Sequence, residues 1–462
     1  MAAVLHSRAP AHSWLDTAPV VGRLHARDHL VASLVLATVG VLLLTWAWVS
    51  LVRRVTGDPE GVRLVRWATA AWSVPLLLAP PLFSNDGWSY VATGYLAGHG
   101  LSPYDVTPSV LPTPLLSGVD PVWRMTTSPY GPLPLAWGGL VSNLTSDPWL
   151  LLYAYRLLAC AGLVLLALAV PRLARRAGLD PARASALAVA SPLVLVHGIG
   201  GLHNDILVVG LVAAAFAVSR REAWLLGAVL AGAAAAVKLP GGLAAVGVVL
   251  LSLVPAAGLL ARMVRSLQVA AVALGTLLGV SVLSGLGIGW IGGLASTANE
   301  PAHLAPSAVV GLWLTKLLRL TGPPGRALVR AWPPIPLAKD IGLVLLAGVL
   351  AWLLLRRRVG DDGAALVGGA GALLAATVLS PALHYWYFLW CLPLLVCVPL
   401  RRGPRWAALA LLGALGPLAV ADPALHIPWL SRLALWSLLL APLLGWAAAA
   451  RTSPSRTPAS VE

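Results

Sequence analysis

Acidic side chains are scarce in this sequence, and one of them follows closely on an apolar run. The run Trp67 to Phe83 has the composition of a membrane helix, and Asp86 stands at the start of the segment Ser84 to Asp105. A carboxylate beside the end of a membrane helix usually faces a water-filled cavity. There it can act as a general base that takes a proton from a hydroxyl group. The alternative is that Asp86 only caps a short helix at the membrane surface.

Further polar side chains stand where later apolar runs end. His203, Asn204 and Asp205 separate two such runs, and Lys238, one of only three lysines, follows another. These groups can hydrogen-bond to a sugar or a phosphate, and a lysine can pair with a phosphate. The alternatives are that Asn204 or Asp205 caps the next helix, and that Lys238 reaches out to lipid headgroups.

One arginine and several aromatic rings complete the candidates. Arg156 lies inside the apolar run Trp149 to Val170, so we expect it to pair with an acid or a phosphate. The aromatic rings could stack on a sugar, or they could form the belt that membrane proteins place at the interface. They are Trp88, Tyr90 and Tyr95 near Asp86, and His384, Tyr385, Trp386 and Trp390 at the start of a late run. Tyr104 and Tyr130 adjoin prolines, and we interpret them as structural.

The composition indicates a polytopic, all-α membrane protein. Hydrophobic residues make up 58% of the 462 residues, and charged residues only 11%. Apolar runs of about 17–25 residues recur along the chain, and inside a bilayer such runs form helices. The net charge of +15 comes from arginines in short loops, which is typical of cytoplasmic loops and does not suggest nucleic acid. The three cysteines, within apolar runs, show neither metal-ligand spacing nor a disulfide framework.

The alternation of apolar runs with basic loops predicts about 13 crossings, with the N-terminus outside and the C-terminus inside. The short run Tyr130 to Leu144 contains Pro and Gly, so we expect it to enter the membrane only part-way. The predicted crossings are Leu30–Leu51, Trp67–Phe83, Trp149–Val170, Ala184–Ile199, Ile206–Val218, Trp224–Val237, Leu243–Leu260, Val269–Leu286, Asp340–Leu355, Ala364–Leu379, Phe388–Leu400, Trp406–Ala421 and Ile427–Ala449.

This topology predicts a single transmembrane domain, residues 29–450, between an N-terminal tail (1–28) and a cytoplasmic tail (451–462). Two long outer segments, 84–130 and 287–337, are expected to carry short surface or re-entrant helices. The positions of the basic loops place all the candidate residues on the non-cytoplasmic face. This placement does not depend on the chemistry of the candidate residues themselves. They are Asp86, His203–Asn204–Asp205, Lys238, Glu300 and His384–Tyr385–Trp386.

Three motifs, taken in order, carry a resemblance to a known family. They are GYLAGHGLSPYD at the end of the segment that holds Asp86, SPYGPL around Tyr130, and HND at 203–205. Together they resemble the actinobacterial polyprenol-phosphate-mannose-dependent α-1,6-mannosyltransferases, which are type C glycosyltransferases (GT-C) of the plasma membrane. The resemblance covers about Leu30 to Ala449. It implies a polyprenyl phosphomannose donor on the outer, periplasmic face, a lipid-anchored mannan acceptor of the lipomannan or lipoarabinomannan type, and inversion at the anomeric carbon.

Residue by residue, the resemblance implies that Asp86 is the general base. It further implies that Asn204 and Asp205 line the site and that Lys238 meets the donor phosphate. An Asp-x-Asp pair, which could hold a metal ion, is absent beside Asp86, so we expect no metal and no cofactor. In the family Tyr104 and Tyr130 match positions taken as architectural.

Two alternatives remain open from the sequence. The segment 287–337 holds no recognisable family motif, so the same fold could use another polyprenyl-phosphate sugar, such as arabinose, or another acceptor. The chain could also be a transporter of a lipid-linked sugar. Transporters, however, place their polar groups near the middle of the membrane on broken helices, and here most candidates lie at the outer ends of helices.

Overall fold

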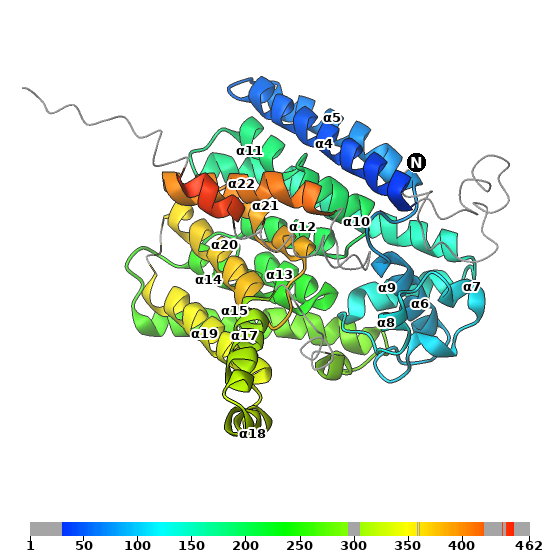
Figure 1. The fold of residues 1–462 in the computed structure, drawn as a ribbon. Coiled ribbons are helices and arrows are strands. Elements are labelled where there is room, and N and C mark those ends of the chain that lie inside the picture. Colours follow the sequence, from blue (N-terminus) through cyan, green and yellow to red (C-terminus); the bar gives the residue numbers. More distant parts are fainter. Residues whose placement is uncertain are drawn as a thin grey trace, which may run out of the picture.

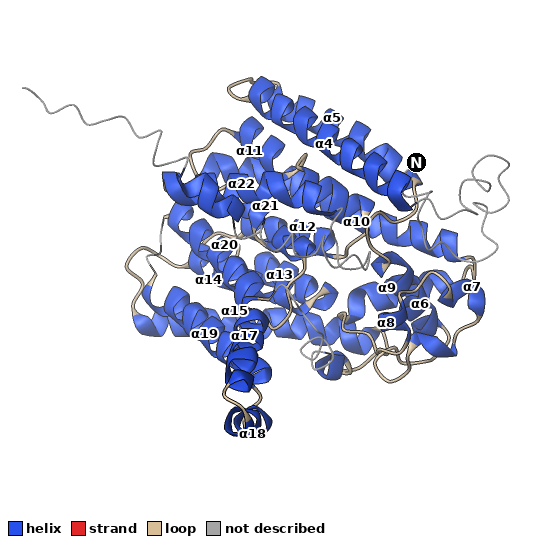
Figure 2. Cartoon of the chain, in the orientation of Figure 1, coloured by secondary structure: helices blue, strands red, loops and turns tan. Residues whose placement is uncertain are grey.

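Every regular element that the structure describes is a helix, as the composition predicts (Figures 1 and 2). The computed structural model describes residues 30–293, 305–357, 359, 361–419, 437 and 440–447. The principal helices are α4 (Leu30–Val55), α5 (Gly61–Leu78), α6 (Asp86–Gly98), α9 (Pro132–Ser142), α10 (Pro148–Arg176), α11 (Pro181–Ala188), η2 (Leu193–Gly200), α12 (Asp205–Val218), α13 (Leu225–Val237), α14 (Ala244–Ser252), α15 (Leu259–Leu283), α19 (Pro334–Arg356), α20 (Asp362–Leu379) and α22 (Arg402–Leu418).

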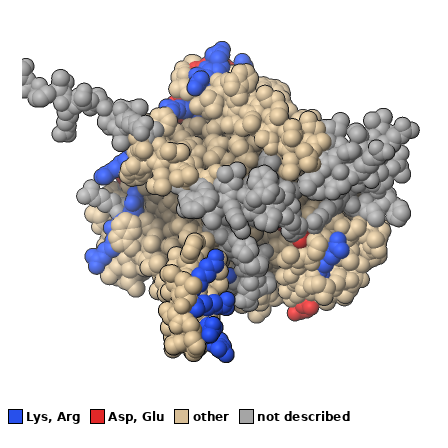
Figure 3. All heavy atoms as spheres, in the orientation of Figure 1, with Lys and Arg blue, Asp and Glu red and all other residues tan. Residues whose placement is uncertain are grey.

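Among the described residues, five helices are long and apolar enough to cross a membrane. They are α4, α10, α15, α19 and α20, and a sixth span is counted if α11 and η2, which meet at a bend of 48°, form one broken crossing. Shorter apolar helices, including α12 and α13, pack between them. Figure 3 shows broad uncharged areas over one face of the molecule. The chain is therefore a multi-pass membrane protein, while the count of about 13 crossings stays a prediction.

Both long outer segments contain short helices, as expected. In the first, α6 is followed by η1 (Pro108–Val110), α7 (Thr113–Leu116) and α8 (Pro121–Arg124). Together with α9 they gather at one side of the long helices (Figure 1). α9 has only 11 residues, which agrees with a segment too short to cross. In the second segment, α17 (Pro306–Leu320) and α18 (Pro323–Ala331) project from the body.

Several predicted crossings differ from the observed helices. The run Phe388 to Leu400 holds only the end of a 3₁₀ segment, η4 (Tyr385–Trp390), and a one-turn helix, α21 (Leu392–Leu395). The prolines in this stretch lack the N–H that a longer helix needs. Earlier in the chain, the predicted crossing Leu243–Leu260 contains α14, which already ends at Ser252. The next helix, α15, begins at Leu259, so Arg262 and Arg265 lie in its first turns and not in a loop before it.

Some predictions fall outside the residues that the structure describes. They concern the tails 1–28 and 451–462, Glu300, and most of the last predicted crossing, Ile427–Ala449.

Candidate active site

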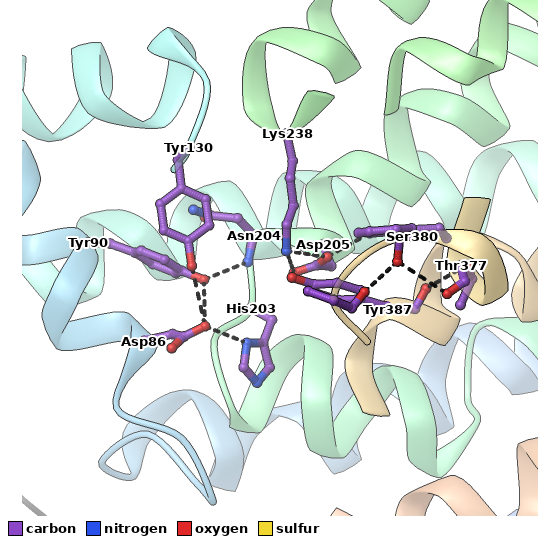
Figure 4. Close-up of polar contacts among 12 residues, drawn as sticks. Asp86, Tyr90, Tyr130, His203, Asn204, Asp205, Lys238, Thr377, Ser380 and Tyr387 are labelled. Carbon is purple, nitrogen blue, oxygen red and sulfur yellow. Dashed lines mark hydrogen bonds and ion pairs between the residues drawn. The ribbon is translucent and has the colours of Figure 1, made fainter. Parts of the chain in front are cut away.

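The carboxylate of Asp86 is surrounded by side chains from three separate parts of the chain. Its Oδ2 lies 3.5 Å from the hydroxyl of Tyr90, 3.4 Å from that of Tyr130 and 3.3 Å from Nδ1 of His203. Both hydroxyls donate to it, and Figure 4 shows these groups pointing toward one another. No described residue makes a hydrogen bond to Oδ1. One oxygen of the carboxylate therefore has no hydrogen-bond partner among the described residues.

The backbone around this carboxylate is strained on both sides. Phe83, just before the segment that holds Asp86, has φ = 61°, and Leu202, directly before His203, has φ = 57°. Non-glycine residues rarely adopt this left-handed conformation, and it persists where the surrounding structure imposes it, often at functional sites. These two sharp turns bring the end of η2 and the start of α6 together, as the hydrogen bond from Leu82 N–H to the carbonyl of Gly200 also shows.

Helix capping does not account for these polar residues. Asp86 is the first residue of α6, yet the N-cap residue Asn85 makes no side-chain capping bond. At α12 the N-cap residue Asn204 makes none either, and its buried Nδ2 has no hydrogen-bond partner among the described residues. Instead the N–H of Asn204 donates to the hydroxyl of Tyr90, at 3.5 Å. The carboxylate of Asp86 is thus directed to Tyr90, Tyr130 and His203, and neither Asn85 nor Asn204 caps its helix through its side chain.

Electrostatics keep Asp86 charged. Burial raises the pKa of its carboxyl group, but the contact with His203, together with the charges of His203, Lys238 and His384, lowers the pKa below the ordinary value of 3.8. For Tyr90 and Tyr130, burial and then the charge of Asp86 raise the phenol pKa well above 10.0. At neutral pH the cluster is therefore an ionised carboxylate held by two neutral phenols that donate hydrogen bonds to it.

A second polar pair lies next to this cluster. Nζ of Lys238, which follows α13, lies 3.0 Å and 3.2 Å from the two carboxylate oxygens of Asp205. Nε1 of Trp390 donates to the same carboxylate at 2.6 Å. The ammonium group also lies over the rings of Tyr387, at 4.3 Å, and Tyr130, at 5.7 Å. Asp205 is fully buried, so this pair fixes the lysine at a defined place in the protein.

Aromatic rings hold His203 in place. The ring of Trp386 stacks on His203 with centroids 3.9 Å apart, and His384 stacks on the same tryptophan at 4.5 Å. Three flat rings thus lie nearly parallel, with Trp386 in the middle, and the His203 ring contacts Asp86. The stack on Trp386 and the contact with Asp86 together define the position of the His203 ring.

Asp86 and Lys238 line one cavity of about 400 Å³. Its polar end also includes Tyr130 and His384. The aromatic part consists of Trp123, Trp386, Tyr387 and Trp390, and the apolar wall consists of Pro129, Leu239, Pro240, Leu243, Leu343, Leu346, Ala376, Pro381 and Ala382, with Ser380 between them. Leu343 and Leu346 of this wall belong to α19 and Ala376 belongs to α20, and both helices are candidate membrane spans. The cavity therefore joins a charged end to a surface suited to a lipid chain.

Several candidates lie away from the cavity. Arg156 does not line it, and among the described residues it pairs with no acid; its guanidinium donates to the backbone carbonyls of Ala79 and Ile199. Those carbonyls stand where helices end and lack helical partners, which is why the buried charge is satisfied there. Trp88 packs edge-on against Trp149, with centroids 5.1 Å apart.

Some of the tyrosines support the fold, and others line the cavity or contact its charged groups. The hydroxyl of Tyr104 donates to the carbonyl of Tyr130, which fits a structural role. Tyr130 itself does more than support the fold, because it contacts Asp86 and lines the cavity. Tyr385 is fully buried outside the cavity lining, whereas its neighbour Tyr387, which we did not single out, faces Lys238. Trp123 was also missed, because in the sequence it looks like any tryptophan of a surface helix.

His203 should set the pH at which Asp86 loses its charge. A His203→Gln variant removes the contact that lowers the pKa of Asp86, so the effect of burial dominates and that pKa rises. The carboxylate of Asp86 can act as a base only in its charged form, which exists above its pKa and disappears as the pH falls below that pKa. We therefore expect the acid limb of the kcat/KM profile to move to higher pH. The exposed His99, replaced by Gln, provides the control and should leave the profile unchanged. An unmoved acid limb in the His203 variant would contradict this role.

Fold and site together define a multi-pass helical membrane protein with an ionised carboxylate at the polar end of a partly apolar cavity. Comparison with known proteins gives the family. A profile described as "Alpha-(1->6)-mannopyranosyltransferase, N-terminal domain" matches residues 1–254, and one described as "MptB C-terminal domain" matches residues 330–418. The chain belongs to this family of α-(1→6)-mannopyranosyltransferases.

Relatives in several actinobacteria support the same assignment. The chain is 34% identical to alpha-(1->6)-mannopyranosyltransferase A of Mycobacterium tuberculosis, over 81% of this chain and 73% of the relative. It is 32% identical to a probable alpha-(1->6)-mannopyranosyltransferase of Mycolicibacterium smegmatis, over 84% and 76%. It is 31% identical to the A enzyme of Corynebacterium glutamicum, over 76% of each chain. No solved structure matches the chain.

Proposed function

We propose that this mannosyltransferase moves mannose from polyprenyl phosphomannose to a lipid-anchored α-1,6-mannan, on the outer face of the plasma membrane and with inversion at the anomeric carbon. In this proposal the protein is a GT-C enzyme that needs no metal ion or other cofactor. The names of the relatives support the mannosyl group and the linkage. The resemblance of the sequence motifs suggests the lipid-linked donor.

The observation that carries the proposal is the arrangement of Asp86 in the cavity. Oδ2 is occupied by two phenols and His203, and Oδ1 is open to a substrate. A sugar hydroxyl at Oδ1 would have a charged, oriented acceptor for its proton. The apolar wall on α19 and α20 continues from this end of the cavity and offers a place for the polyprenyl chain.

The reaction then proceeds as a single displacement. Asp86 accepts the proton of an acceptor mannose hydroxyl while that oxygen bonds to the anomeric carbon of the donor. The bond from this carbon to the phosphate oxygen breaks on the opposite face, which turns a β-linked donor into an α-linked product. The polyprenyl phosphate leaves with the electron pair, and because phosphate is a good leaving group it needs little help from an acid. Lys238 stands at the cavity to meet its charge.

The substrate is tested by offering the purified protein labelled polyprenyl phosphomannose, polyprenyl phosphoarabinose and a nucleotide-activated mannose with an α-1,6-oligomannoside acceptor. We expect label in the oligomannoside only from the lipid-linked mannose, joined through a new α-1,6 bond that an α-specific mannosidase removes. Product from the arabinose donor at an equal rate would support the alternative substrate. Product from the nucleotide donor alone would exclude a polyprenyl donor.

A transporter of lipid-linked sugar remains as the second candidate, and it rests on the bent pair of α11 and η2, since broken helices mark many transporter sites. Proteoliposomes decide between the two. Transfer of labelled mannose to an acceptor outside the vesicle, without movement of the intact donor across the bilayer, supports the enzyme. Movement of the donor without formation of a glycosidic bond supports the transporter.

A further inference from the structure

A second cavity, of about 370 Å³, brings arginines of two helices together away from Asp86. Its lining residues are Arg183, Leu400, Arg402, Arg405, Trp406 and Leu409. The first of these arginines belongs to the first turn of α11, and the other two belong to the first turn of α22. α11 leads through η2 to Gly200, close to the candidate active site. The arginine cavity thus lies at the opposite end of this bent pair, on the side that the charge rule assigns to the cytoplasm.

Two of the arginines in this cavity, Arg183 and Arg405, have no acidic partner among the described residues. No acid belongs to its lining, and neither Arg183 nor Arg405 forms an ion pair with any residue that the structure describes. The neighbouring acid, Asp180, accepts hydrogen bonds from the backbone N–H groups of Gly57, Ala182 and Arg183 and forms no ion pair with the arginine side chains of the cavity among the described residues.

The two half-buried guanidinium groups also act on each other. Burial, and then the positive charge of Arg183, lower the pKa of Arg405. Like charges that are partly withdrawn from water remain unfavourable until an anion joins them. An anion bound between Arg183 and Arg405 would therefore stabilise this arrangement.

The lining indicates the kind of anion. Guanidinium groups bind phosphate oxygens in pairs, and the rest of the lining, Leu400, Trp406 and Leu409, is apolar. Trp406 is also exposed at 43%, as is usual for a tryptophan at the level of lipid headgroups. Basic pockets between membrane helices on the cytoplasmic side bind the headgroups of anionic lipids. We propose that this cavity binds the phosphate of an anionic phospholipid from the cytoplasmic leaflet.

The experiment is lipid binding to the purified full chain, followed by native mass spectrometry. Phosphatidylglycerol, phosphatidylcholine and, in a separate arm, inorganic phosphate are titrated against the wild type and two double variants. Arg183→Gln with Arg405→Gln alters the cavity. Arg53→Gln with Arg172→Gln makes the same charge change at exposed arginines of the same basic face.

We expect phosphatidylglycerol to bind the wild type more tightly than phosphatidylcholine does, and the cavity variant to lose about tenfold or more of that affinity. The exposed variant should stay within about twofold, because solvent screens those charges. The single variant Arg405→Gln should lose several-fold, which guards against a folding defect in the double variant. Equal losses in the two double variants, unchanged binding in the single variant, or equally tight binding of inorganic phosphate would each overturn the proposal.

Discussion

Replacing Asp86 with asparagine is expected to lower mannosyl transfer by about 10²–10⁴-fold, the usual loss when a general base is removed. Asparagine keeps the size and the hydrogen-bonding capacity of the side chain at Tyr90 and Tyr130, so the cluster should stay assembled. What it removes is the ability to take a proton from the acceptor. The measurement is kcat with saturating donor and acceptor, since the loss should appear in the chemical step and leave donor affinity largely intact.

A matched control is available in the same outer segment. Asp105 is exposed and does not belong to the cavity, so Asp105→Asn should keep the wild-type rate. Both variants should elute as the wild type does on size exclusion and should unfold at a similar temperature. Full activity of a well-folded Asp86→Asn variant would exclude Asp86 as the base and would leave the carboxylate only a structural role.

Removing the charge of Asp205 should have the largest effect on stability. An Asp205→Asn variant leaves Lys238 in a largely buried place without its counter-charge, and breaking such a pair on one side costs about 3–5 kcal/mol. Activity should fall with it, because the lysine loses the partner that places it in the cavity. Thermal unfolding in detergent measures the first effect, and transfer from the lipid-linked donor measures the second.

A double variant separates the structural from the functional part of this pair. Asp205→Asn combined with Lys238→Gln removes both charges and should recover most of the lost stability, while transfer stays low because no cation remains for the phosphate. The exposed pair Arg54–Asp58 is the control, and Asp58→Asn should cost only about 0–1 kcal/mol. If the double variant regains activity together with stability, Lys238 does not act on the substrate.

The sequence predicts which candidates share a region but not which of them touch. The ends of apolar runs and the positions of arginines place Asp86, His203 and Lys238 on one face, because membrane insertion obeys simple rules of hydropathy and charge. The structure brings them into one cluster. The pairing of Lys238 with Asp205 depends on the rotation and depth of two packed helices, and no one-dimensional pattern contains that information.

Arg156 and the segment after His384 show the other limit. A buried arginine needs acceptors, and sequence patterns suggest acids or phosphates, whereas here backbone carbonyls at two helix ends are the acceptors. Likewise the run after His384 is apolar enough to be predicted as a crossing, yet it folds into short turns. This irregular stretch carries Trp386, Tyr387 and Trp390, which line the cavity.

The most direct test of the account is an experimental structure of the protein with polyprenyl phosphomannose bound. We expect the mannose beside Asp86, the phosphate within reach of Nζ of Lys238, at about 3 Å, and the first isoprene units along Leu343 and Leu346. A donor whose phosphate lies on the basic face, beyond the reach of both Asp86 and Lys238, would contradict the proposed mechanism.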